Sequence, residues 1–213
     1  METSYPLHFV DIETTCLDPQ DGYIIEIAIL TSLDGGKTIH STFESKIKPQ
    51  DLKNANPKAL QINGYRESEW RDAPQWSEIA PQILQILKYG IIVAHNVMFD
   101  WTWLDYHIKS STGKSISYLK ICTQSLVWIK IPNTKSASLS TMRDLFGWSH
   151  DQSHTALKDI QDTHRLFLKL VYPQPKIIQT LRDRLQKRRE EGLHVIGLAC
   201  DEMDELLRFF PLL

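Results

Sequence analysis

The chain has 213 residues, of which 42% are hydrophobic and 23% are charged, and this composition is ordinary for a globular protein and argues against intrinsic disorder. This length allows one domain with a full hydrophobic core and a small appendage. The formal net charge of −2 provides no general attraction for nucleic acid, so any attraction for phosphate must be local or come from bound metal.

The cysteines and the absence of a long apolar run bear on the compartment of the protein. Cys16, Cys122 and Cys200 are odd in number and lack metal-site spacing, which fits a reducing compartment better than a disulfide framework. Residues 1–6 are polar, and no apolar run approaches the roughly 20 residues that a membrane span needs. We therefore expect a cytoplasmic protein that has no membrane partner.

Short apolar runs separated by turn residues predict the strands. The run at residues 23–30 is interrupted only by Glu26, and turn residues at 18–22 separate it from the run before it. Residues 39–47 alternate apolar and polar side chains, as a half-buried strand at a sheet edge does, and Pro49 marks its end. The predicted strands are residues 7–10, 23–30, 39–47, 91–94 and 119–122.

Apolar residues at helical spacing predict the helices. In residues 97–108 the apolar stripe includes Trp101, which we expect in the core, whereas Trp103 lies outside the stripe and is a candidate for stacking on bases. The predicted helices are residues 57–61, 77–88, 97–108, 139–146 and 156–171. Because strands and helices alternate along the chain, we predict an α/β fold.

The composition changes where two prolines end the last of these helices. Residues 176–191 are dense in charge, with acidic residues interleaved among arginines and lysines. We therefore divide the chain into a main domain at residues 1–172 and a helical C-terminal appendage at residues 173–213. The charged stretch is either a solvated helix or a surface for a nucleic-acid backbone, and the apolar residues 206–213 dock on the main domain, a second copy or a protein partner.

Acidic residues lie at the ends of predicted strands and at the beginnings of predicted helices. Asp11 and Glu13 are two positions apart at the end of the first strand, so both side chains project from the same face. Asp100 begins the helix after the fourth strand, and Asp159 lies in the first turn of the last helix. Open α/β sheets place ligands at the carboxyl ends of their strands, where we expect these carboxylates to converge. Their oxygens suit Mg²⁺ or Mn²⁺.

His154 comes two residues before the last predicted helix, where its imidazole can reach solvent while Asp159 reaches a metal. Taken singly, each of these residues has a more ordinary explanation as a turn former, a partner of the helix dipole or a surface residue. Their combination favours a hydrolytic site with His154 as general base.

Three stretches of the sequence resemble the motifs of the DEDDh exonuclease family, the proofreading group of the ribonuclease H-like fold. Residues 9–15, FVDIETT, are similar to the first motif, residues 95–100, HNVMFD, to the second, and residues 154–159, HTALKD, to the third. The order and the separations also match, and the resemblance extends over residues 7–171. It implies a ribonuclease H-like mixed sheet of five strands flanked by helices.

The resemblance also implies a role for each residue of the predicted site. Asp11, Glu13, Asp100 and Asp159 become ligands of two Mg²⁺ or Mn²⁺ ions, and His154 takes a proton from the attacking water. The residues that it places around the terminal nucleotide are Thr14, Leu17, Ile62, Asn63, Asn96 and Phe99.

The resulting hypothesis is a metal-dependent 3'-to-5' exonuclease that acts on 3' ends of single-stranded DNA and releases nucleoside 5'-monophosphates. An exoribonuclease with the same site stays open as an alternative, since no residue tells how a 2'-hydroxyl is treated. An alternative from another class is a catalytically inactive nucleic-acid-binding subunit. The presence of all the predicted catalytic residues argues against that alternative, because function depends on the site more than on the fold.

Overall fold

The computed structural model describes residues 5–131, 134–151 and 153–172. A compact unit ends at Leu170. The predicted appendage at residues 173–213, its helical structure and its docking therefore lie outside the described residues. Within the described ranges, no helix combines the length and the apolar character that a membrane crossing requires.

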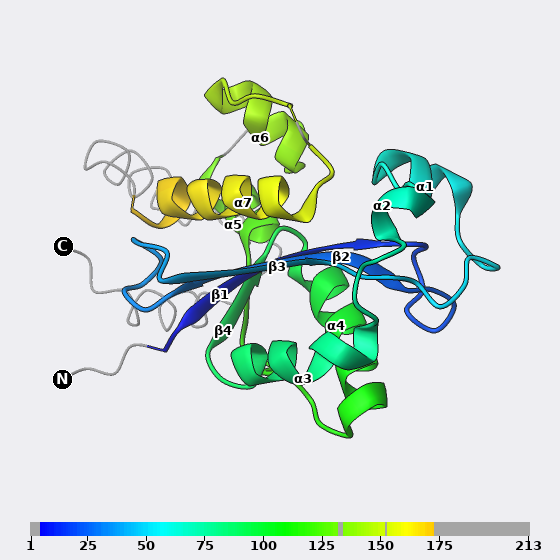
Figure 1. Cartoon of the computed structure of the whole chain (residues 1–213). Helices are drawn as coiled ribbons and strands as arrows, with labels where there is room; N and C mark the ends of the chain where they lie inside the picture. The colour runs from blue at the N-terminus through cyan, green and yellow to red at the C-terminus, as the bar shows by residue number, and fades with distance from the viewer. Residues whose placement is uncertain (1–4, 132–133, 152, 173–213) are drawn as a thin grey trace, which may run out of the picture. The chain divides into compact units, whose positions relative to one another are not determined.

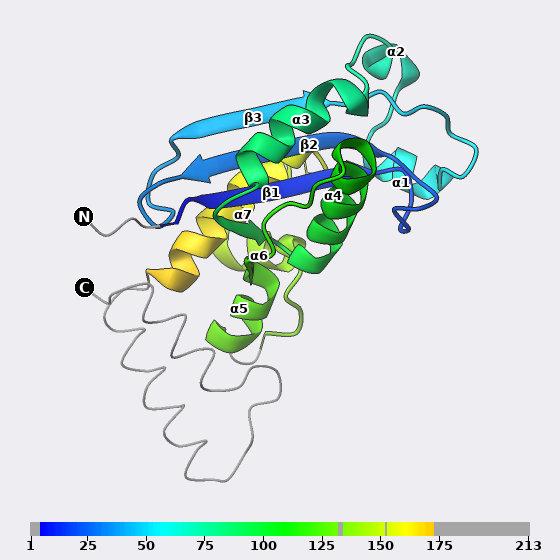
Figure 2. The same cartoon turned by 90° about the horizontal axis from the view of Figure 1, so that it is seen from below.

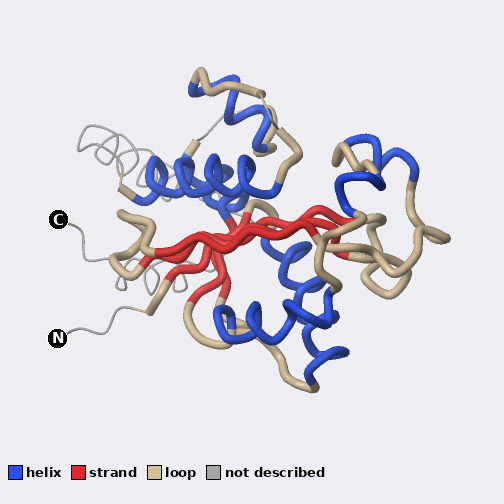
Figure 3. The backbone as a smooth tube through the Cα atoms, in the orientation of Figure 1, coloured by secondary structure: helices blue, strands red, loops and turns tan. Residues whose placement is uncertain are grey.

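The strands form one mixed sheet in the order β3-β2-β1-β4-β5, which lies between layers of helices in Figure 3. The pairs β1–β2 and β2–β3 are antiparallel, whereas β1–β4 and β4–β5 are parallel. This confirms the predicted mixed sheet and the place of the third strand at its edge. The strands are β1 (Leu7–Thr14), β2 (Ile24–Ser32), β3 (Ser41–Lys46), β4 (Ile91–Ala94) and β5 (Lys120–Cys122).

Within the described residues, the structure contains all the helices predicted for the main domain and two more, α2 and α5. The short helix α2 is held by Trp70, which is buried and whose indole N–H donates to the carbonyl oxygen of Ile25 at 2.7 Å. A contact of this kind leaves no periodic pattern in a helix of one turn. The helices are α1 (Pro57–Ile62), α2 (Glu67–Trp70), α3 (Trp76–Leu87), α4 (Val97–Thr112), α5 (Thr123–Lys130), α6 (Leu139–Phe146) and α7 (Ala156–Val171).

Alternate side chains of β1 pack against different helices. Val10 and Ile12 belong to a buried cluster that also contains residues of α3 and α4. Phe9 instead contacts α7, with ring centroids 5.2 Å from Phe167 and 4.8 Å from His164. Figures 1 and 2 show the result, with α3 and α4 on one side of the sheet and α7 on the other.

The same alternation decides where the acidic side chains of β1 point. β1 continues past the predicted end at residue 10 because its pairing with β2 runs on to Thr14. Asp11 and Glu13 therefore share the face of Phe9, toward α7. In the antiparallel register Glu13 stands opposite Glu26, so two carboxylates are neighbours on one face of the sheet.

The expectation for Trp103 was wrong, whereas Trp101 packs against the core cluster as expected. Trp103 is only 1% exposed, and its ring stacks on that of His107 with centroids 5.4 Å apart. Trp101 is partly buried, its indole N–H donates to the carbonyl oxygen of Ser117, and Lys120 lies over its ring. Trp103 is thus a core residue and is not available for stacking on bases.

Candidate active site

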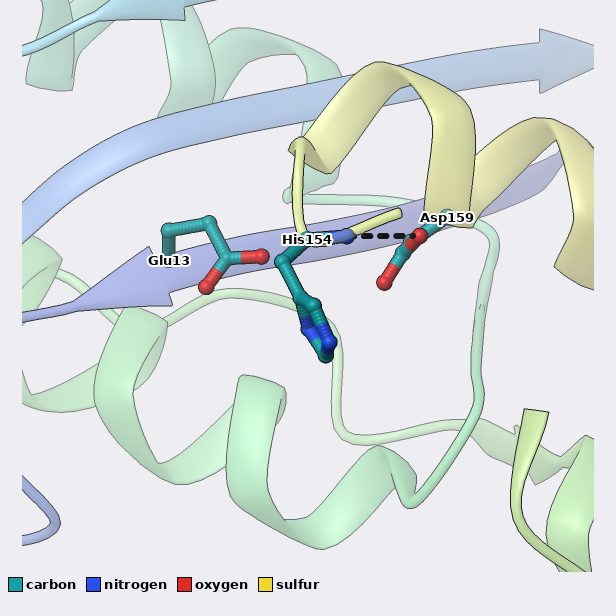
Figure 4. Close-up of side chains that lie close together, drawn as sticks. All are labelled: Glu13, His154 and Asp159. Carbon is teal, nitrogen blue, oxygen red and sulfur yellow. Dashed lines mark hydrogen bonds between the residues drawn. The ribbon is translucent and has the colours of Figure 1, made fainter. Parts of the chain in front are cut away.

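Three of the predicted site residues lie around one point in space. Glu13 comes from β1, Asp159 from the first turn of α7, and His154 from the turn before that helix. One ligand atom of each lies within 4.8 Å of those of the other two, and Figure 4 shows the three side chains around a common space. A cation at this place would have two carboxylates and an imidazole as neighbours.

Asp11 and Asp100 lie beside this group. Burial raises the pKa of Asp11 well above its usual value, and the negative charges of Asp100, Glu13 and Asp159 raise it further. Asp100, in the first turn of α4, is 4% exposed, and burial raises its pKa to about 8 against the opposing effect of backbone hydrogen bonds at Ile12 and Asp100 itself. The structure therefore brings all the predicted carboxylates together at the end of β1.

The electrostatics of the cluster fit a bound cation. Burial raises the pKa of Glu13 to about 8, and the charges of Asp159, Glu26 and Asp100 add to the effect. Ionised carboxylates at this density repel one another, and a cation between them relieves the repulsion. Carboxylate oxygens are the ligands that Mg²⁺ and Mn²⁺ prefer, so the residues present fit these ions.

His154 sits in a turn of unusual backbone geometry. Its φ of 67° lies in the left-handed region, which is uncommon for residues other than glycine. Its backbone N–H donates to Oδ1 of Asp159 at 3.3 Å, which ties the turn to the first turn of α7. The side chain is exposed, so its imidazole can exchange protons with solvent next to the carboxylates.

Glu26, which was not among the predicted site residues, docks the beginning of α7 on the sheet. The side chain is 5% exposed, and its Oε1 accepts a hydrogen bond from the backbone N–H of Ala156 at 2.8 Å. The first N–H groups of a helix have no partner within the helix, and a carboxylate is a favourable acceptor there. Glu26 thus fixes the helix that carries Asp159 relative to the strand next to Glu13.

Arg143, on α6, is a second residue of the site that the sequence pattern did not predict. It is 2% exposed and forms ion pairs with Asp159 at 2.6 Å and with Asp162 at 2.8 Å. It lies in none of the three motifs, and the one signal in the sequence was an arginine among the apolar residues of a predicted helix.

The residues expected around the terminal nucleotide differ in their exposure. Leu17 is 82% and Ile62 is 45% exposed, so both present apolar surface to solvent. Thr14 is buried, and its hydroxyl donates to the carbonyl oxygen of Cys16 at 2.7 Å. The Nδ2 of Asn63 donates to the carbonyl oxygen of Thr14 at 3.0 Å, which holds the end of α1 beside the end of β1.

The two residues from the second motif lie at the start of α4. Asn96 is exposed and precedes the helix in a left-handed conformation with φ of 79°. Phe99 is partly buried, and its ring lies 6.1 Å from that of Trp103 between centroids. Phe99 directly precedes Asp100 in the chain, and Asn96 is the N-cap of the same helix.

The sheet order and the acidic cluster define an exonuclease domain of the ribonuclease H-like fold. The chain belongs to the Exonuclease family, whose model matches residues 9–167, and the predicted resemblance to DEDDh exonucleases is thereby confirmed.

Its relatives include both DNA polymerase subunits and a ribonuclease. The chain is 30% identical over 181 residues to a DNA polymerase III PolC-type protein of Thermotoga maritima, covering 85% of this chain but only 13% of that relative. It is 26% identical to the DNA polymerase III subunit epsilon of Aquifex aeolicus, covering 76% of this chain and 78% of the relative. It is 27% identical to ribonuclease T of Shewanella denitrificans, covering 78% of this chain and 80% of the relative.

Solved structures share the fold. Exonuclease I superposes with a TM-score of 0.70 at 19% identity, over 87% of this chain and 44% of that one. Exonuclease X in complex with 5' overhanging duplex DNA superposes with a TM-score of 0.58 at 24% identity, over 78% of this chain and 91% of that one. At these identities the superpositions establish the fold, and they confirm the predicted class.

The raised pKa of Glu13 predicts how the stability of the metal-free protein depends on pH. Between pH 4.5 and about 8 the folded state keeps a proton that the unfolded chain has lost, so the free energy of unfolding falls as the pH rises. The difference between these pKa values corresponds to at most about 5 kcal/mol. We expect the melting temperature in EDTA to fall less across this window in Glu13→Gln than in the wild type. If the melting temperatures of the two proteins changed with pH in the same way, Glu13 would not be the group with the raised pKa.

The contact between Glu26 and Ala156 predicts a graded loss of stability. Glu26→Ala leaves a buried N–H without its acceptor and lowers the free energy of unfolding by about 1 to 3 kcal/mol. Glu26→Gln keeps an acceptor oxygen, and we expect it to lose less. Urea denaturation in EDTA measures both variants, and equal losses would show that the hydrogen bond to α7 is not the cause.

Proposed function

We propose that the chain is a metal-dependent 3'-to-5' exonuclease that hydrolyses the terminal phosphodiesters of single-stranded DNA and releases nucleoside 5'-monophosphates. The observation that carries the proposal is the convergence of Glu13, His154 and Asp159 within 4.8 Å, beside Asp11 and Asp100, in a chain of the Exonuclease family.

The proposed cofactors are two Mg²⁺ or Mn²⁺ ions per site, held by Asp11, Glu13, Asp100 and Asp159. When bound, such ions activate water and stabilise the charge that develops on the attacking and leaving oxygens. The predominance of carboxylates favours these hard ions. A solved structure that superposes with a TM-score of 0.69 is described as the zinc ion bound form of the E. coli ExoI–ssDNA complex, so a metal ion also occurs in a protein of this fold.

The residues of the chain itself would position the substrate and move the proton. His154 accepts the proton of the attacking water at its imidazole, which is exposed and borders the carboxylates. Apolar contact with the terminal nucleotide comes from Leu17, Ile62 and Phe99, and polar contact from Thr14, Asn63 and Asn96.

Single-stranded DNA is the preferred substrate in this proposal. Support comes from the DNA polymerase III relatives and from E. coli exonuclease I, whose structures include complexes with dA16 and dT13 oligonucleotides. Ribonuclease T is a relative of similar identity, so an exoribonuclease is the alternative.

The main domain at residues 1–172 contains the family match and every proposed site residue. Residues 173–213 are proposed as a surface for a protein partner or a second copy.

A degradation assay tests the proposal. Purified protein is incubated with 5'-labelled single-stranded DNA and RNA of one sequence in Mg²⁺, Mn²⁺ or EDTA, beside Asp11→Ala. We expect stepwise shortening of the DNA from its 3' end with either ion, and none in EDTA or with the variant. Failure to shorten either polymer would favour an inactive binding subunit, internal fragments would exclude the polarity, and faster shortening of RNA would favour the exoribonuclease.

The same assay tests the role of His154. His154→Ala removes the general base and should lower kcat on the order of 10²- to 10⁴-fold while Mn²⁺ still binds. His150→Ala is the matched control, since His150 is another exposed histidine before α7 that pairs with Asp144 outside the site. An unchanged kcat for His154→Ala, or equal losses in both variants, would remove the assigned role.

A further inference from the structure

Arg143 joins α6 to two acidic side chains of α7. Its Nη2 donates to Oδ1 of Asp159 at 2.6 Å, and its Nε donates to Oδ2 of Asp162 at 2.8 Å. The guanidinium is buried, and a buried charge costs free energy unless its partners satisfy it. The geometry of two donors on one planar group fixes both carboxylates relative to α6.

The two acidic partners are not equivalent. Asp162 also binds Lys158, one turn earlier on the same helix, whose Nζ lies 2.8 Å from Oδ1 and 2.7 Å from Oδ2. Asp162 therefore keeps a cationic partner when Arg143 is removed. For Asp159, by contrast, the ion pair found within the described residues is the one with Arg143.

Packing between α6 and α7 has an apolar basis of its own. Leu139 and Met142 of α6 belong to one buried cluster with Leu166 and Leu170 of α7. Burial of apolar area of this kind holds helices together without an ion pair. Arg143 is thus not required to account for the docking of the two helices.

The hydrogen bonds to Asp159 decide which of its oxygens faces the site. Oδ1 accepts from Arg143 and, at 3.3 Å, from the backbone N–H of His154. Figure 4 shows the other oxygen turned toward the side where the His154 imidazole lies. A carboxylate whose one oxygen is bonded in this way cannot rotate freely, so its second oxygen is presented to the space next to Glu13.

We propose that Arg143 is a positioning residue for the metal site: it holds Asp159 by one oxygen and thereby presents the other to a divalent cation. This inference rests on the proposed function, because it assigns Asp159 to the metal. Groups that orient metal ligands in this way typically change metal affinity or activity by about 10- to 100-fold when they are removed.

The test compares Arg143→Gln with the matched control Asp162→Asn. The control changes the other buried ion pair and leaves the contact between Arg143 and Asp159 in place. Calorimetric titration of the metal-free full chain with Mn²⁺ measures binding, the melting temperature in EDTA measures folding, and kcat and KM are measured with single-stranded DNA. We expect about 10- to 100-fold weaker Mn²⁺ binding and a similarly lower kcat in Arg143→Gln. KM should change much less, and Asp162→Asn should bind Mn²⁺ like the wild type even where its melting temperature falls.

A second variant covers the case in which Arg143→Gln does not fold. Arg143→Met combined with Asp162→Leu removes both buried charges, so neither is left without a partner, and Lys158 is 20% exposed and can reach solvent. We expect the same loss of Mn²⁺ affinity in this folded double variant.

The outcomes separate this inference from the proposed function. A wild-type chain that binds no Mn²⁺ and degrades no polymer would overturn both. A wild type that binds Mn²⁺, together with folded Arg143 variants of equal affinity, would overturn the positioning role alone. Equal losses of affinity in Arg143→Gln and Asp162→Asn would show that Arg143 acts only through general stability.

Discussion

The site depends on the docking of the beginning of α7 beside the end of β1. Glu26 accepts the N–H of Ala156 there, and Phe9 packs on the rings of Phe167 and His164 further along the helix. These contacts set the distance between the carboxylates of β1 and those of α7. A shift of the helix by a fraction of a turn would separate them, because neighbouring side chains on a helix point in different directions.

Charge in this region is arranged unevenly. The carboxylates at the end of β1 and the start of α4 are buried or partly buried, and burial together with mutual repulsion raises the pKa of Asp11 and Glu13. The cations Arg143 and Lys158 are paired with acidic side chains of α7, Arg143 with Asp159 and Asp162 and Lys158 with Asp162. Under the proposed function, the negative charge of these carboxylates would attract a divalent ion, and that ion would let a chain of slightly negative net charge approach phosphate.

Elements with a strong local pattern were predicted well. β4, α6 and α7 have the bounds expected from the sequence, because each has a clear apolar pattern and distinct end signals. β1 extends beyond residue 10, where the apolar run ends, because its pairing with β2 also includes Asp11 and Glu13. Trp103 is buried although it lies off the apolar stripe, because it packs into the same core cluster as Leu104 and Ile108 and its ring stacks on that of His107, one turn later on α4.

The sequence by itself determined the family, the fold class and the identity of the acidic residues and His154, because these lie in short motifs whose local pattern places them at strand ends and helix starts. The roles of these residues stay predictions. Only the tertiary structure decided which contacts hold Glu26 and Arg143 beside the site. Their partners Ala156 and Asp159 lie on another element of the chain, and hydrogen bonds between elements depend on packing that no local pattern encodes.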